Sequence, residues 1–162
     1  MRLLAGCVLS LVASAAAQRG DKAGEEQPPL PASLVLPDAA PRSPAEESAS
    51  SRLAPGFAIA LFAAEPLVGD PVAAAFDAAG RLWVVEMRGY MNDLDAKSER
   101  EPNGRVVVLT DDDRDGVADR ASVFADGLVL PRAVLPLRGG ALVVAPPELL
   151  WLPDADGDQR AD

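Results

Sequence analysis

The sequence contains no histidine and only one cysteine, Cys7, in 162 residues. The lack of histidine excludes a Ser-His or Cys-His catalytic pair, a histidine metal ligand and a CxxCH haem motif within these residues. Because Cys7 lies in an expected export signal, the rest of the chain should hold no disulfide, thiolate nucleophile or Cys-ligated zinc. Basic residues are also few, with 15 Lys and Arg against 25 Asp and Glu and a net charge of −10. No nucleic-acid partner is expected, because phosphates attract basic surfaces.

The first residues have the pattern of a secretory signal peptide. A positive start is followed by an apolar stretch over residues 3–13 and by small residues at 15–17. We therefore expect a signal peptide over residues 1–17 and an exported protein, periplasmic or extracellular. An uncleaved anchor is the alternative, but the apolar stretch is shorter than the roughly 20 residues that span a bilayer. The letters around Cys7 also resemble a lipobox, although Cys7 lies near the start of the apolar stretch. No transmembrane span is expected after the signal.

A proline-rich segment and a helix start signal come next. Residues 18–42 are rich in proline, alanine and acidic residues, which predicts a disordered tether. Ser43 can cap a helix, Pro44 suits its first position and Glu46 completes a capping box. These residues predict a short helix over residues 43–53.

Residues 54–162 read as short strands separated by turn residues, so the expected fold class is all-β. The expected strands are Gly56–Ala63, Val72–Phe76, Arg81–Glu86, Val106–Thr110, Ser122–Phe124, Ala133–Leu137, Ala141–Ala145 and Leu149–Pro153.

The strand pattern repeats. Residues 107–119 match residues 150–162 at an offset of 43, and residues 80–84 match residues 140–144 at an offset of 60. The difference between the two offsets corresponds to a polar insertion in the first repeat, between about Arg88 and Gly104. A period in the forties with about four short strands per unit is typical of a β-propeller blade. We therefore expect a partial β-propeller, with a first blade and most of a second. Two unrelated hairpins in a sandwich are the alternative, but the recurring acidic pattern argues against them.

Each repeat ends in the acidic pattern D-x-D-x-D-x-x-x-D, whose spacing suits a calcium site. Oxygen ligands at positions 1, 3 and 5 of a tight loop converge on one point, and Ca²⁺ takes six to eight such oxygens. Position 6 is Gly116 in the first loop and Gln159 in the second, so we expect the second to fit less well. Neither loop has the position-12 glutamate of an EF-hand. The alternative is a solvated acidic turn. The expected Ca²⁺ ligands are Asp111, Asp113, Asp115 and Asp119, and Asp154, Asp156, Asp158 and Asp162.

Other polar and aromatic residues give weaker signals. Trp83 and Trp151 lie beside aliphatic residues on strands and are expected to pack in the core or between blades rather than to stack on a ligand. Three polar residues at the end of the strand that contains Trp83 are candidates for ligand contact, or else form the base of the inserted loop. They are Glu86, Arg88 and Tyr90. No catalytic residue is assigned.

Several stretches together resemble one known family, the membrane-bound dehydrogenase-like propeller proteins of Planctomycetes and Verrucomicrobia. The resemblance covers nearly all residues from Ser43 onward. The matching stretches are SPAEE at 43–47, PGF at 55–57, AAEPLV at 63–68, FD at 76–77, GRLWVVEMRGY at 80–90, VFADGL at 123–128 and both acidic loops.

The resemblance implies a propeller related to the soluble glucose and sorbosone dehydrogenases, which use pyrroloquinoline quinone. Many members also carry helical repeats and a C-terminal cytochrome c module. The sequence departs from the family by ending at Asp162 without a haem motif, and by having Arg114 and Gln159 where the pattern usually has glycine. No cofactor-binding or catalytic residue is therefore carried over.

The implied function is that of the N-terminal part of an exported, calcium-stabilised propeller. Its complete form would be a quinone-dependent dehydrogenase with a carbohydrate or alcohol substrate and a c-type cytochrome as partner or downstream module. The alternative is a non-enzymatic propeller scaffold that binds carbohydrate or protein partners, since fold does not fix function.

Overall fold

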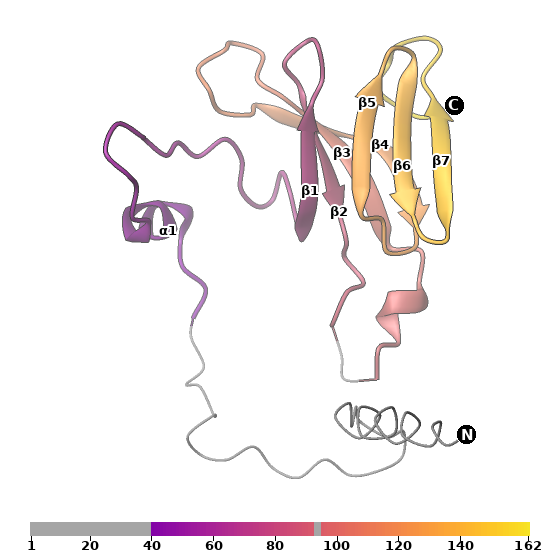
Figure 1. Ribbon diagram of the computed structural model, residues 1–162, viewed down its shortest axis with the longest axis horizontal. Helices are drawn as coiled ribbons and strands as arrows, with labels where there is room; N and C mark the ends of the chain where they lie inside the picture. Colours follow the sequence, from indigo (N-terminus) through magenta and orange to yellow (C-terminus); the bar gives the residue numbers. More distant parts are fainter. Residues whose placement is uncertain (1–39, 93–94) are drawn as a thin grey trace, which may run out of the picture. The chain divides into compact units, whose positions relative to one another are not determined.

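The computed structural model describes residues 40–92 and 95–162, and it is mostly β-sheet with one short α-helix (Figure 1). The expected signal peptide and nearly all of the expected tether lie outside the described residues. Within the described ranges, no helix has the length and apolar character needed to cross a membrane. Residues 42–162 form one compact unit.

Helix α1 spans Pro44–Ser50 and begins where the sequence predicts. The Ser43 side chain accepts a hydrogen bond from the Glu46 amide, and the Glu46 side chain accepts one from the Ser43 amide. This is the predicted capping box. The helix ends three residues before the predicted end, and none of its residues is buried.

The strands form two antiparallel sheets, which we call sheet A and sheet B. Sheet A contains β1 (Pro71–Phe76), β2 (Leu82–Glu86), β3 (Gly104–Thr110) and β4 (Arg120–Leu128), in that order. Sheet B contains β5 (Ala133–Leu137), β6 (Gly140–Ala145) and β7 (Glu148–Pro153), in that order. The predicted insertion between β2 and β3 contains a 3₁₀ turn, η3, at Ser98–Arg100.

Seven of the eight predicted strands are present, and the prediction for Gly56–Ala63 is wrong. Gly56 lies in a turn, and residues 57–63 pair with no strand among the described residues. A run of β-forming residues becomes a strand only when a neighbour completes its backbone hydrogen bonds.

Sheets A and B pack face to face around the main hydrophobic core. Alternating residues of β2 and β3 project from sheet A toward sheet B, because side chains of a strand alternate between its two faces. The Trp83 ring meets the Phe124 ring edge-on, with centroids 4.5 Å apart. The buried residues of this core are Trp83, Val85, Val106, Val108, Phe124 and Leu128 from sheet A and Val134, Ala141 and Val143 from sheet B.

The opposite face of sheet A is covered by a segment of coil rather than by a sheet. Val84, Val107 and Leu109 are buried there against residues from the range 62–68. Both faces of sheet A are therefore covered, which explains the nearly continuous apolar sequence of β3.

The strand register corrects the sequence alignment of the two repeats. Trp83 lies opposite Val108, and Leu142 lies opposite Trp151. Because Val108 and Trp151 are equivalent at an offset of 43, Trp83 corresponds to Leu142, at an offset of 59 rather than 60. A shift of one residue exchanges the faces of a strand, so the correction changes which residues of sheet B point outward.

Candidate metal loops and the adjoining cleft

The two acidic loops occupy the same place in the repeated structure. The first, residues 111–119, joins β3 to β4, and the second, residues 154–162, follows β7. Each is closed at its base by its ninth residue. The Asp119 amide donates to the Thr110 carbonyl at 2.9 Å, and the Asp162 amide donates to the Pro153 carbonyl at 3.0 Å.

The loops also share a backbone conformation, including two left-handed residues. Position 4 has a positive φ in both loops, 64° at Arg114 and 77° at Gly157. Position 6 has a positive φ in both, 92° at Gly116 and 69° at Gln159. Each loop thus places one glycine and one other residue in the region that favours glycine. Arg114 and Gln159, which stand where the family pattern has glycine, adopt the same backbone conformation as the glycines at the equivalent positions. Backbone strain therefore gives no reason to expect one loop to bind a cation better than the other.

The carboxylates at positions 1, 3 and 5 converge in each loop. Asp111, Asp113 and Asp115 each offer an oxygen within 4.8 Å of the others, and so do Asp154, Asp156 and Asp158. The predicted residues at position 9 are not part of these clusters. Instead, Asp119 accepts a hydrogen bond from the Asp112 amide, and Asp162 accepts one from the Ala155 amide. Three clustered carboxylates suit a hard cation such as Ca²⁺, which also neutralises their mutual repulsion.

The first carboxylate is held differently in the two loops. Asp111 accepts main-chain N–H groups on both oxygens, from Arg114 at 2.6 Å and from Gly116 at 2.9 Å. Asp154 accepts only one, from Gln159 at 3.3 Å, and its Oδ1 is buried without a partner. A buried acceptor without a donor is costly and therefore suits a cation.

Asp112 turns away from the first cluster. Its carboxylate accepts two hydrogen bonds from Arg120, at 2.9 and 3.3 Å, and these raise the pKa of the Arg120 guanidinium. This residue therefore belongs to the outside of the loop, as its place between the predicted ligands indicates.

Both loops are fastened to a neighbouring segment through position 8. The Ala118 amide donates to the Phe62 carbonyl at 2.7 Å, and the Ala161 amide donates to the Phe124 carbonyl at 2.8 Å. In the second loop Gln159 also accepts a hydrogen bond from the Ser122 hydroxyl. The second loop thereby ties sheet B to β4 of sheet A.

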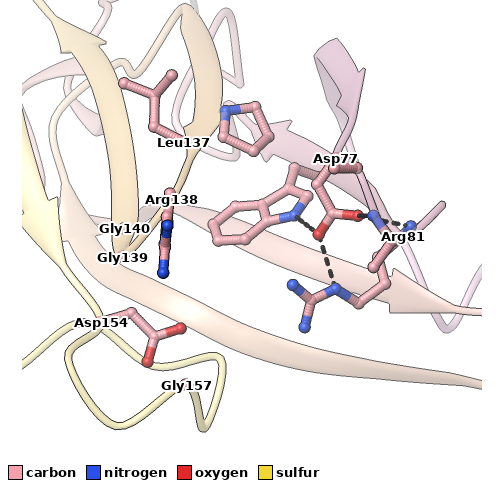
Figure 2. A pocket seen from close by; sticks show the side chains of 12 residues that line it. Asp77, Arg81, Leu137, Arg138, Gly139, Gly140, Asp154 and Gly157 are labelled. Carbon is pink, nitrogen blue, oxygen red and sulfur yellow. Dashed lines mark hydrogen bonds and ion pairs between the residues drawn. The ribbon is translucent and has the colours of Figure 1, made fainter.

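A cleft of about 570 Å³ lies beside the second loop (Figure 2). It is lined by the turn between β1 and β2, the turn between β5 and β6, and residues Asp154 and Gly157 of the loop. Figure 2 shows Asp77 and Arg81 on one side of the cleft and Asp154 on the other. Sequence reasoning did not predict this cleft, because it exists only where the turns of two sheets meet.

Asp77 organises one wall of the cleft. Its carboxylate accepts hydrogen bonds from the amides of Ala79 and Arg81, from Arg81 Nε at 2.7 Å and from Trp83 Nε1 at 3.0 Å. Burial alone would raise the pKa of Asp77, but these hydrogen bonds outweigh it and lower the pKa. The charge of Asp77 therefore serves to hold the turn and the core tryptophan in place.

Glu86 is a fully buried carboxylate with three partners. Arg105 and Arg88 both donate to its Oε2, the latter at 2.8 Å, and the Gly69 amide donates to Oε1 at 3.0 Å. Burial would raise the pKa of Glu86, but the hydrogen bonds from Arg105, Gly69 and Arg88 lower it below its usual value. Because both of its oxygens accept hydrogen bonds within the protein, Glu86 holds residue 69 against sheet A and is not oriented toward a ligand. A glutamate in the apolar run LWVVE is the signal that could have revealed this cluster.

The remaining candidates differ in exposure. Trp83 is 3% exposed and belongs to the core, as predicted, whereas Trp151 is 48% exposed on β7. Tyr90 is also half exposed. Trp151 is therefore not part of the core among the described residues, and its expected role in packing against a neighbouring blade stays a prediction.

A family model described as a domain of unknown function, DUF7133, matches residues 43–162, which span α1, both sheets and both acidic loops. No curated protein and no solved structure matches the chain.

Proposed function

The chain belongs to the DUF7133 family, and on that premise we propose that it is the N-terminal part of an exported, calcium-stabilised β-propeller. The complete form would be a quinone-dependent dehydrogenase acting on a sugar or another alcohol. The observation that carries the architectural part is an apolar packing face that sheets A and B share.

The outward face of sheet B repeats the face of sheet A that sheet B covers. In sheet A that face is made by Trp83 and Val108 with their neighbours, and in sheet B the equivalent residues are Leu142 and Trp151. Leu149, on the same face, is 66% exposed. A third sheet that packed on sheet B as sheet B packs on sheet A would cover this apolar face. Successive sheets related in this way form the radial array of a propeller.

The calcium part of the proposal rests on the two carboxylate clusters. Positions 1, 3 and 5 supply oxygens in both loops, and Asp154 Oδ1 is a buried oxygen that has no donor. A Ca²⁺ ion held by Asp154, Asp156 and Asp158 would fix the base of the second loop, which is hydrogen-bonded to β4. The ion would therefore stabilise the contact between neighbouring sheets.

The dehydrogenase part rests on the family resemblance of residues 43–162. The resemblance extends through the strand and turn that contain Trp83, Glu86 and Tyr90. In this chain Trp83 packs in the core, and Glu86 forms buried ion pairs. The substrate, pyrroloquinoline quinone and a c-type cytochrome partner are accordingly assigned to the complete propeller and not to named residues here.

The test uses the full-length protein expressed from its gene. We expect it to reduce an artificial electron acceptor with a sugar or alcohol, dependent on added pyrroloquinoline quinone, and to lose thermal stability on calcium chelation. A protein that responds to calcium but has no activity across a panel of sugars and alcohols would instead be a calcium-stabilised binding scaffold. A protein that responds to neither would overturn the proposal.

A further inference from the structure

The cleft beside the second acidic loop has the size and lining of a small-molecule site. Its volume of about 570 Å³ lies within the range of roughly 300–1,000 Å³ that is usual for pockets that hold small organic ligands. Apolar groups line it from both sheets, with Ala78 and Trp83 on the side of sheet A and Pro136 and Leu137 on the side of sheet B. In such a site a few polar groups fix the orientation of the ligand.

Four charged side chains line the cleft, and two of them form an ion pair with each other. Arg81 binds Asp77 at 2.7 Å through its Nε. The two terminal nitrogens of Arg81 have no hydrogen-bond partner among the described residues. Because an arginine carries five N–H donors in one plane, Arg81 can bind a second oxygen group while it holds Asp77.

The other two charged groups, Arg138 and Asp154, are not paired with each other. Arg138 is exposed in the turn between β5 and β6 and has no hydrogen bond or ion pair to any described residue. Figure 2 shows it on the side of the cleft where Asp154 lies. Asp154 Oδ1 is buried without a donor. The cleft therefore has one positive and one negative group whose hydrogen-bonding capacity is unused.

A calcium ion in the second loop changes the charge at the edge of the cleft. Asp154 lines the cleft and also belongs to the carboxylate cluster with Asp156 and Asp158. Without a cation, these carboxylates repel an anion that approaches the cleft. Ca²⁺ removes this repulsion and leaves Arg138 available. One oxygen from each of three carboxylates is also fewer than the six to eight oxygens that Ca²⁺ takes, so ligand oxygens can join its coordination.

We propose that this cleft binds a small organic carboxylate, and that it does so when the second loop holds calcium. Arg138 and the terminal nitrogens of Arg81 supply the N–H donors, because guanidinium groups bind carboxylates through paired N–H groups. The apolar part of the ligand packs against the lining that includes Leu137. The inference rests on the proposed calcium site of the second loop and requires no dehydrogenase activity.

The test measures the coupling between calcium and a carboxylate probe in the full-length protein. Benzoate is the probe, because it joins one carboxylate to an apolar ring, and benzamide is its neutral analogue of similar shape. Calorimetric titration in a chelating buffer and in saturating calcium should show that calcium lowers the dissociation constant of benzoate by about fivefold or more. Saturating benzoate should lower the dissociation constant of calcium by the same factor, because coupling between two sites is reciprocal. Benzamide should show no coupling.

Two pairs of variants locate the coupling. Arg138→Gln should abolish it, whereas Arg132→Gln should keep it, because Arg132 is an exposed arginine outside the cleft and the change of charge is the same. Asp156→Asn should abolish the effect of calcium on benzoate binding. Asp113→Asn, at the same position of the first loop, should leave that effect at the parent value.

A calcium titration without benzoate separates this inference from the proposed calcium site. Calcium binding that benzoate does not strengthen would overturn the cleft proposal and leave the calcium site standing. Coupling that persists in Arg138→Gln would have the same meaning, because the carboxylate would then bind elsewhere. A protein that binds no calcium would overturn both proposals.

Discussion

Asp111 and Asp154 occupy the same position in two loops of the same backbone conformation, but their carboxylates are satisfied differently. Both oxygens of Asp111 accept main-chain N–H groups, whereas Oδ1 of Asp154 is buried without a donor. The second loop therefore has more to gain from a cation than the first, although Gln159 replaces glycine there. We therefore predict a stronger response to a cation in the second loop, which is opposite to the order expected from the sequence.

The first prediction follows from this difference. Without calcium, Asp154→Asn should stabilise the protein by about 1–3 kcal/mol, because it removes a buried charge that has no partner. Asp111→Asn should not stabilise the protein, because the side-chain NH₂ of asparagine would face one of the two main-chain N–H groups that now donate to Asp111. Chemical denaturation in a chelating buffer measures both. Equal effects of the two substitutions would contradict the difference described above.

The second prediction concerns calcium binding by the first loop. Asp113→Ala should remove its contribution to the calcium-dependent rise in melting temperature, whereas Asp112→Ala should leave it nearly intact because Asp112 pairs with Arg120 outside the cluster. In the unmodified protein, calcium at 100 times its dissociation constant should stabilise the fold by about 2.7 kcal/mol. Without a position-12 glutamate we expect a dissociation constant on the order of 10⁻⁴ to 10⁻³ M. Calorimetric titration before and after chelation provides the measurement.

The third prediction concerns the buried ion pairs of Glu86. Glu86→Gln should destabilise the protein by about 3 kcal/mol at neutral pH, because Arg105 and Arg88 lose their shared carboxylate. The exposed Glu148→Gln on β7 is the matched control and should have little effect.

The pH dependence of this effect has a definite sign. The pKa of Glu86 is lower in the folded than in the unfolded chain, so its stabilisation is fully present above the unfolded-state value of about 4.3. It is lost as the pH falls through the lower folded-state value. Urea titrations of the parent and Glu86→Gln should therefore converge only in strong acid. A difference that disappears above pH 6 would contradict the assignment.

The fourth prediction separates the two tryptophans. Trp83→Ala should cost about 3–5 kcal/mol, because it empties a core site against Phe124 and leaves Asp77 without its indole donor. In the 162-residue chain Trp151→Ala should cost less than about 1 kcal/mol, since the side chain is half exposed there. In the full-length protein the proposed third sheet would cover this side chain, and the cost should be larger. Denaturation followed by circular dichroism, rather than by tryptophan fluorescence, allows a direct comparison.

Much of the local structure could be predicted from the residues alone. The capping box of Ser43 and Glu46, the tight turn at Asp77 and the spacing of the acidic loops are local patterns, and each is present in the structure. Such features depend on residues a few positions apart, whose geometry the backbone itself constrains.

Other features depended on pairing between distant segments. The strand predicted at Gly56–Ala63 has no partner among the described residues, and the one-residue error in the repeat offset became visible only from the pairing of Leu142 with Trp151. The sequence of one strand does not determine its register, because the register is set by the neighbouring strand and by the turn between the two strands.

The sequence by itself determined the β-rich character of the chain, the two acidic loops and their shared spacing. Only the tertiary structure decided that Glu86 meets Arg105, that Asp154 keeps a buried oxygen without a donor, and that the second loop bonds to Phe124 of sheet A. The physical reason is that hydrogen-bond satisfaction and burial belong to the assembled sheets, since each depends on atoms that other segments bring to the same place.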